Sequence, residues 1–227
     1  MTINHHPDDA TILAYAAGTL DEGFAVLVSC HLETCPHCRD TLKTAEMIGG
    51  AALETAGDAP VAEGSFGRLL ERISASDATS GSPVPGTAKD IRPDRTTEWQ
   101  KLPAALQNYM DGTIDNIDWK RAGPGVWQKP VKLSETASTS MRLLRIAPGR
   151  SVPEHGHGGQ EMTLIICGAY EDEIGHFGPG DVADLDEHVE HQPRVISGED
   201  CICLAVTEAP TRFKGFVSRL LQPLIGI

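Results

Sequence analysis

The sequence lacks any apolar run long enough to cross a bilayer. Runs such as Met162–Cys167 are short, whereas a membrane-spanning helix needs about 20 mostly apolar residues. The opening residues, MTINHHPDDA, also lack the charged and then apolar layout of a secretory signal. We therefore expect a cytoplasmic protein that does not bind a membrane. In that reducing compartment, six cysteines suit metal binding, redox chemistry or core packing better than a disulfide framework.

Positive charge is also scarce. The chain has 19 Lys and Arg against 32 Asp and Glu, which gives a net charge of −13. The phosphates of duplex DNA would repel such a chain, so direct nucleic-acid binding is disfavoured. Residues 1–50 hold Arg39 and Lys43 as their only basic side chains among several acidic ones. This acidic segment would suit a basic protein partner, or it is simply a solvated surface.

The composition changes along the chain and predicts two domains. Residues 76–95 are rich in Ser, Thr, Gly and Pro without apolar periodicity, which is typical of a linker. Residues 1–75 have helical periodicity, and residues 96–210 contain short β-type runs separated by Gly and Pro. The tail over 211–227 returns to helical spacing. The predicted fold class is therefore α+β, with a small helical bundle followed by an antiparallel β-barrel or sandwich.

Four helices are expected before the linker. Asp8 and Asp9 cap the first, Leu20 to His31 forms the second, and the third begins near Pro36 and stops at Gly49-Gly50. The fourth covers residues 62–73 and is amphipathic. Its apolar stripe has no obvious core left to fill, and it consists of Phe66, Leu69, Leu70 and Ile73.

The strands are expected in the second half of the chain. The predicted strands are Val126–Leu133, Thr139–Ile146, Met162–Cys167, Tyr170–Phe177, Arg194–Ile196 and Cys201–Val206.

The stretch Cys35-Pro36-His37-Cys38 allows two interpretations. A thioredoxin-like dithiol needs its C-x-x-C between a strand and a helix of a βαβ unit, and the preceding segment here is helical in period. With His31, the same letters become H-x3-C-x2-C, which is zinc-ligand spacing. The two helices meeting there would bring His31, Cys35 and Cys38 together, and His6 is the natural fourth ligand. A redox dithiol and ordinary core residues remain alternatives.

His6 and the H-x3-C-x2-C segment, within a short helical unit, closely resemble the zinc-binding anti-sigma domain. Members of that family bind and inhibit a sigma factor of the extracytoplasmic-function class. The resemblance implies a zinc site formed by His6, His31, Cys35 and Cys38, and it places Cys30 and His37 outside the ligand set. It also implies that the helix with Phe66, Leu69, Leu70 and Ile73 packs on the sigma factor.

A second motif lies in the β-rich half. Gly149-x5-His155-x-His157-x3-Glu161-x6-Gly168 fits the first cupin motif at every position. Residues two apart on a strand share a face, so His155 and His157 point together, and Glu161 meets them from the next strand. In the second motif, eleven residues after Gly180 of the Pro-Gly-Asp turn lead to His191.

The second motif departs from the usual pattern, because Asp186-Glu187-His188 replaces its proline-x-glycine. His188 is therefore a rival of His191 as a ligand. A His3Glu set could hold zinc, manganese, iron or nickel, with zinc favoured here, and ligand type alone does not choose among them. A cupin whose site is empty or purely structural is the alternative.

Cys201 and Cys203 alternate on a late strand and share a face. They are either buried small hydrophobic residues or oxidation sensors near the cupin metal.

The order of the two ligand sets and the linker resembles the ChrR-type anti-sigma factors along the whole chain. This resemblance implies a 1:1 complex with the sigma factor, no enzymatic activity, and a cupin needed for the response to singlet oxygen and organic hydroperoxides. Two alternatives remain: a metal-dependent cupin enzyme of dioxygenase or isomerase type with an accessory zinc domain, and a thiol oxidoreductase acting through Cys35 and Cys38.

Overall fold

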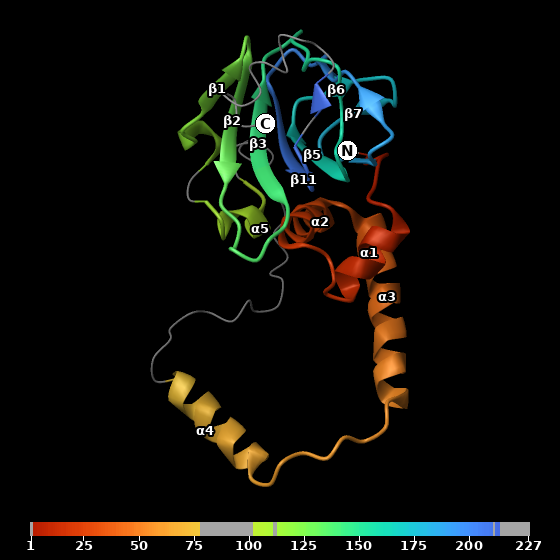
Figure 1. The fold of residues 1–227 in the computed structure, drawn as a ribbon, viewed down its shortest axis with the longest axis vertical. Helices are drawn as coiled ribbons and strands as arrows, with labels where there is room; N and C mark the ends of the chain where they lie inside the picture. Colours follow the sequence, from red (N-terminus) through yellow and green to blue (C-terminus); the bar gives the residue numbers. More distant parts are fainter. Residues whose placement is uncertain (1, 78–101, 111–112, 211, 214–227) are drawn as a thin grey trace. The chain divides into compact units, whose positions relative to one another are not determined.

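The structure is a computed structural model, and it describes residues 2–77, 102–110, 113–210 and 212–213. These residues form two compact units (Figure 1). One unit combines the described residues up to Gly49 with those from Leu102 onwards, and the other runs from Gly50 to Asp77. The contacts therefore group the first helices with the sheets. Nearly all of the predicted linker over 76–95, and most of the predicted tail over 211–227, lie outside the described residues.

The first and third helices begin where the sequence indicates, and the second begins at Glu22, after the cap Asp21, rather than at Leu20. The four long helices are α1 (Asp9–Ala16), α2 (Glu22–Thr34), α3 (Pro36–Thr55) and α4 (Ser65–Asp77). The carboxylate of Asp8 accepts a hydrogen bond from the Thr11 amide at 2.6 Å, and Asp21 accepts one from Gly23 at 3.3 Å. Pro36 occupies the first position of α3, where its missing N–H costs nothing. No helix in the described part of the chain is long and apolar enough to span a bilayer.

The predicted bounds of the third and fourth helices differ from the structure. α3 continues through Gly49-Gly50 to Thr55, since neither glycine adopts the positive φ that ends a helix. A glycine within a helix costs only about 1 kcal/mol relative to alanine, which weakens the helix without stopping it. α4 is shifted from the predicted 62–73 to Ser65–Asp77.

The second half is antiparallel throughout its described sheets. Two short helices, α5 (Ala104–Gln107) and η2 (Ile114–Asn116), precede it. The strands are β1 (Lys120–Gly123), β2 (Val126–Val131), β3 (Ser140–Ile146), β4 (His155–Gly156), β5 (Glu161–Cys167), β6 (Tyr170–Glu171), β7 (His176–Phe177), β8 (Val182–Leu185), β9 (Glu190–His191), β10 (Arg194–Val195), β11 (Cys201–Thr207) and β12 (Arg212–Phe213). They form sheets in the orders β1-β2-β3-β11-β5-β8, β10-β6-β7 and β12-β4-β9.

Two predicted elements differ from the structure. The strand expected over Tyr170–Phe177 is a hairpin of β6 and β7, because the Asp172 carboxylate accepts hydrogen bonds from the amides of Ile174 and Gly175 and closes a turn. Arg212 and Phe213, expected in a helical tail, form β12 beside β4.

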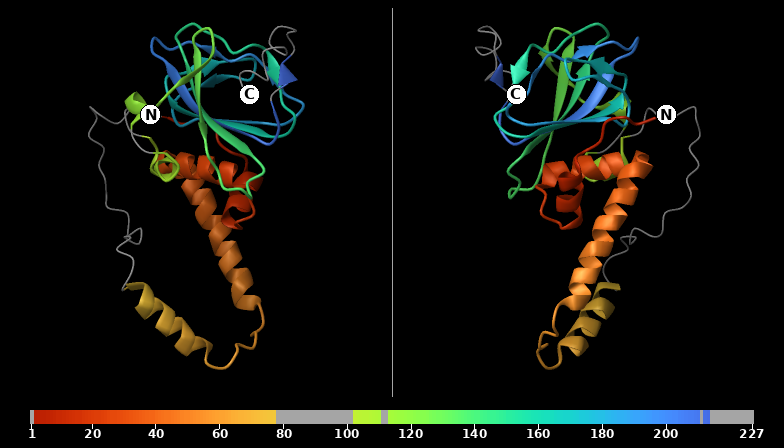
Figure 2. Two further views of the ribbon diagram at one scale, coloured as in Figure 1. Left: turned by 60° about the vertical axis from the view of Figure 1, so that its left-hand side comes forward. Right: turned by 90° about the vertical axis from the view of Figure 1, so that its right-hand side faces the viewer.

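The β11 strand, CICLAVT, is buried on both faces. Ile202, Leu204 and Val206 pack with the helices in one core. Cys201 and Cys203 pack in a second core with residues of the smaller sheets. A strand covered on both sides reads as a continuous apolar run rather than an alternating one. The six-stranded sheet therefore separates the helices from the barrel interior, and Figure 2 shows the first helices against the barrel.

Two acidic side chains, at the start and near the end of α2, connect this helix to the second half of the chain. Asp21 accepts hydrogen bonds from the amide and hydroxyl of Ser138 at 2.8 and 2.7 Å, and from Thr139. The carboxylate of Glu33 accepts hydrogen bonds from the amides of Ala104 and Ala105 at 3.0 and 2.9 Å. Burial opposes the ionisation of Asp21, but these hydrogen bonds outweigh it and hold its pKa well below the ordinary value. Some of the acidic side chains of residues 1–50 therefore stabilise the fold.

The close approach of α2 to the sheet depends on Gly23. A Cβ atom at this position would lie 2.5 Å from Thr139 Oγ1 and 2.9 Å from Val206 Cγ1. We expect Gly23→Ala to lower the free energy of unfolding by about 1–3 kcal/mol, because α2 must move away from a packed face. Urea denaturation of the zinc-loaded chain measures this.

Gly49→Ala is the matched control for this substitution. A Cβ atom at Gly49 meets nothing within 4 Å. Alanine there should be neutral or stabilise the helix by up to about 1 kcal/mol. Equal effects of the two substitutions would show that helix propensity decides the stability and that the α2 contact does not.

Candidate metal centres

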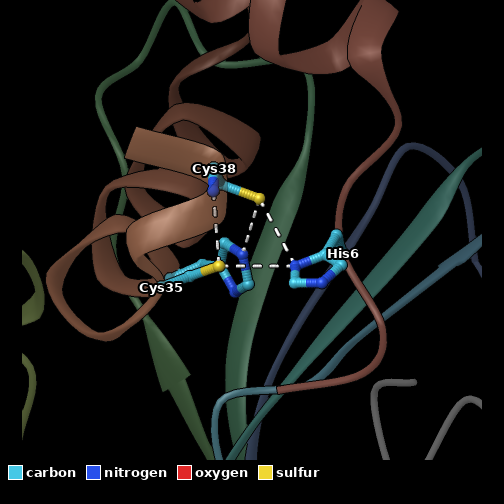
Figure 3. Close-up of side chains that lie close together, drawn as sticks. His6, Cys35 and Cys38 are labelled. Atoms are coloured by element: carbon cyan, nitrogen blue, oxygen red, sulfur yellow. Dashed lines mark hydrogen bonds between the residues drawn. The ribbon is translucent and has the colours of Figure 1, made fainter. Parts of the chain in front are cut away.

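The predicted ligands of the N-terminal site converge at the junction of α2 and α3. The ligand atoms of His6, His31, Cys35 and Cys38 all lie within 4.8 Å of one another. His31 Nε2 is 3.1 Å from Cys38 Sγ, and His6 Nδ1 is 3.4 Å from Cys35 Sγ and 3.5 Å from Cys38 Sγ. Figure 3 shows His6 facing the two sulfurs.

These separations fit a zinc ion. Zinc–sulfur and zinc–nitrogen bonds of about 2.3 and 2.0–2.1 Å in a tetrahedron place the ligand atoms about 3.6 Å apart. Burial, followed by the neighbouring Cys35, raises the pKa of Cys38 to about 12. The Cys38 thiol is therefore protonated until a cation offsets the charge of its thiolate, and metal binding would release this proton.

The surroundings of His31 favour the neutral tautomer that could bind a metal ion through Nε2. Burial lowers its pKa to about 4, so the imidazole is neutral. Its Nδ1 atom lies 2.9 Å from the carbonyl oxygen of Gly180, which can only accept a hydrogen bond. The proton therefore sits on Nδ1, and Nε2 is left with a lone pair that faces Cys38.

The other histidines and cysteines of this region are not part of the cluster. The side chain of His37 is exposed, and its ring is 4.9 Å from that of His6. Cys30 is buried in the helical core, and burial raises its pKa to about 12. His5 stacks on Phe177 with ring centroids 4.3 Å apart. The C-x-x-C opens α3 directly after α2, which is not the strand–helix setting of a thioredoxin-like dithiol.

The cupin residues form a second cluster inside the barrel. The ligand atoms of His155, His157, Glu161 and His191 lie within 4.8 Å of one another, and all four residues are buried. His155 in β4 pairs with His191 in β9, and their Nε2 atoms are 3.1 Å apart. Glu161 opens β5. His188, the rival of His191, is exposed.

The electrostatics of this cluster also fit a metal ion. Burial lowers the pKa of His155 to about 4. Burial opposes ionisation of Glu161, but interaction with His157 and the other histidines outweighs it, and its pKa is lowered. His157 Nδ1 is 3.2 Å from Glu161 Oε2, yet neither ring nitrogen of His157 has a hydrogen-bond partner among the described residues. This arrangement is compatible with His157 and Glu161 as ligands of one cation.

Two features of this region were missed by the sequence reasoning. Asp172 Oδ2 lies 2.8 Å from His191 Nδ1, so a carboxylate orients this histidine. The Tyr170 hydroxyl is buried without a hydrogen-bond partner among the described residues, and burial followed by the charge of Asp172 raises its pKa well above the ordinary value. In the sequence, Asp172 and Gly175 form a turn-type pattern, which was the available signal for the role of Asp172.

The predicted redox cysteines lie in the barrel core. Cys201 and Cys203 are almost fully buried. Burial raises the pKa of Cys201 to about 12 and that of Cys203 well above the ordinary value. Because the thiolate is the reactive form, such thiols react slowly with peroxides.

The predicted sigma-contacting side chains are exposed on α4. The exposed fractions of Phe66, Leu69, Leu70 and Ile73 range from 48% to 73%.

The fold and the two clusters define a cupin protein with a second cluster, of His and Cys residues compatible with a metal ion, in its N-terminal region. Residues 109–210 match the family model described as "ChrR Cupin-like domain". The chain is 38% identical over 227 residues to the anti-sigma-E factor ChrR of Cereibacter sphaeroides, and the match covers 100% of both chains. The chain belongs to the ChrR family, as its sequence motifs predicted.

One solved structure agrees with this placement. The crystal structure of Rhodobacter sphaeroides SigE in complex with the anti-sigma ChrR matches with a TM-score of 0.75 and 34% identity, covering 91% of this chain and 99% of the other. The polyketide cyclase RemF from Streptomyces resistomycificus matches with a TM-score of 0.40 and 16% identity, covering 47% and 86%. A likeness as distant as the latter carries no argument about the chemistry of this chain.

Proposed function

We propose that this chain is an anti-sigma factor that binds an extracytoplasmic-function sigma factor in a 1:1 complex and keeps it from transcription. The observation that carries this is the similarity to the anti-sigma-E factor ChrR along the full length of both chains. A basic sigma factor suits the acidic composition. Since sigma factors act on RNA polymerase, we also place the protein in the cytoplasm.

Exposed apolar side chains support this proposal. Large ones are concentrated between residues 47 and 73, namely Met47, Ile48, Leu53, Val61, Phe66, Leu69, Leu70 and Ile73. Contiguous exposed apolar surface marks sites of interaction with another protein. On α4 the four apolar residues follow helical spacing and form one stripe. We propose that this stripe packs on the sigma factor.

Co-expression of the full chain with the sigma factor encoded beside its gene tests the proposal. We expect a 1:1 complex by size-exclusion chromatography with mass measurement. Replacing Leu69 and Leu70 together with serine should raise the Kd about 100-fold or more, since each buried leucine contributes about 1.5–3 kcal/mol. The exposed Glu71→Ser on the same helix is the control and should change little. Failure of the zinc-loaded wild type to bind would overturn the proposal.

A metal-dependent cupin enzyme of dioxygenase or isomerase type is the second candidate. The observation that favours it is the buried His3Glu cluster, which can hold a Lewis-acidic or redox-active metal. Metal-dependent oxygen uptake or isomerisation by the chain without any sigma factor would favour the enzyme. The anti-sigma proposal requires no turnover.

We further propose that the cupin cluster responds to singlet oxygen or organic hydroperoxides and that this response loosens the hold on the sigma factor. The metals we propose are zinc at the N-terminal cluster and a second divalent ion, zinc or alternatively manganese, iron or nickel, in the cupin. The protonated, buried state of Cys201 and Cys203 favours the cupin metal over these cysteines as the sensing site.

A further inference from the structure

One stretch of the barrel contacts both metal centres. We call residues 172–181 the bridging segment; it runs from the β6–β7 turn through β7 to the Pro-Gly-Asp turn. It belongs to the same compact unit as α1, α2 and the first half of α3. The two clusters are therefore connected through a short piece of chain.

At one end, the bridging segment holds a ligand of the cupin cluster. Asp172 Oδ2 lies 2.8 Å from His191 Nδ1, and the side chain of Asp172 is fully buried. Its other oxygen, Oδ1, accepts hydrogen bonds from the amides of Ile174 and Gly175 at 2.9 and 3.1 Å. The same carboxylate thus orients His191 and holds the β6–β7 turn.

At the other end, the bridging segment holds the N-terminal cluster. The Gly180 carbonyl sets the tautomer of His31 through the 2.9 Å contact with Nδ1. Asp181 Oδ1 accepts hydrogen bonds from the amides of Asn4 and His5 at 2.7 and 3.0 Å, and the buried Asp181 thereby fixes the backbone beside His6. Two ligands of the helical site are therefore positioned by the cupin barrel.

The packing between these ends leaves little room for independent movement. The ring of His5 lies on Phe177, which is 1% exposed. A Cβ atom at Gly175 would be 3.4 Å from His5 Cε1, and one at Gly180 would be 2.8 Å from Ile3 Cδ1. Close-packed elements with such contacts shift together rather than one at a time.

We propose that the bridging segment couples the two metal centres, so that a metal ion held by the cupin cluster strengthens retention of the ion in the N-terminal cluster. Asp172, Gly180 and Asp181 act as positioning residues. Partners that orient metal-bound histidines typically change metal affinity 10–100-fold, and coupling between linked sites is commonly 5–150-fold. By linkage, the N-terminal ion strengthens the cupin site by the same factor.

This inference deepens the proposed function by naming a route from the cupin to the zinc cluster. It rests on metal binding at both clusters and does not depend on the identity of the protein partner. Sigma-factor binding can therefore be present while coupling is absent, and the reverse.

Cobalt(II) provides a signal that reports the N-terminal centre alone in the full chain. Only the N-terminal cluster has thiolate ligands, so the thiolate-to-cobalt absorption band reports that site alone. The rate at which excess chelator removes this band is measured with the cupin loaded. We compare wild type with His157→Ala, which disables the cupin cluster, and with Asp172→Asn, which keeps the side-chain size but removes the carboxylate.

We expect His157→Ala and Asp172→Asn each to accelerate loss of the thiolate band about tenfold, although neither residue belongs to the N-terminal cluster. Asp181→Asn should accelerate it about 10–100-fold. Glu171→Gln, an exposed carboxyl of the same hairpin, is the control and should match wild type. An unchanged rate in both His157→Ala and Asp172→Asn, or a chain that takes up only one cobalt ion, would overturn the proposal.

Discussion

Replacing Cys35 and Cys38 together with serine is expected to abolish zinc binding at the N-terminal cluster and, with it, capture of the sigma factor. Structural zinc sites contribute about 10–16 kcal/mol of apparent binding free energy, which becomes folding free energy. α1 has only eight residues, and a helix of that length is not stable alone. The zinc content of the full chain measures the first effect, and a binding titration with the sigma factor measures the second.

His37→Ala is the control for this double substitution. His37 lies between the two cysteines and near His6, but it is exposed and outside the cluster. It should keep one N-terminal zinc ion and wild-type affinity for the sigma factor. Near-UV circular dichroism of the double variant should retain the barrel signal. Full sigma-factor affinity after complete loss of this zinc would contradict the proposed role of the site.

Replacing His155, His157 and Glu161 with alanine is expected to have the opposite pattern. Capture of the sigma factor in unstressed cells should remain, while induction by singlet oxygen or hydroperoxide should disappear. The reason is geometric: this cluster lies in the barrel, and the helices pack on the other face of the six-stranded sheet. A coupling of about 1–3 kcal/mol between the centres is also too small to empty an N-terminal site worth about 10–16 kcal/mol.

A reporter gene under a promoter dependent on the sigma factor measures this effect. His188→Ala is the matched control, because His188 is an exposed histidine close in sequence to His191 and outside the cluster. It should show normal induction. Normal induction in the triple variant would exclude the cupin metal as the sensing site and return attention to Cys201 and Cys203.

Local sequence patterns predicted much of the fold because they depend on neighbouring residues. Asp8 marks a helix start through a hydrogen bond that reaches only three residues along the chain. The glycine pair of α3 was misleading, because glycine permits a helix end without requiring one. The single strand expected over Tyr170–Phe177 failed for a similar reason: one side chain, Asp172, bends the chain inside an otherwise β-type run.

Spacing and family resemblance indicated the candidate ligand sets, but not their surroundings. H-x3-C-x2-C and H-x-H-x3-E specify which side chains a turn or a strand can bring together. Spacing carries no information about Asp172, Gly180 or Asp181, since each contacts a residue 19 to 177 positions away. Such partners are chosen by packing between elements.

The sequence by itself indicated the two candidate ligand sets, most of the helices and strands, and membership of the ChrR family, because these depend largely on short motifs and local periodicity. Only the tertiary structure decided that the N-terminal helices share a compact unit with the barrel and that one segment contacts both metal centres. The physical reason is that β11 presents apolar side chains on both faces, and the face outside the barrel is buried only when α2 packs against it.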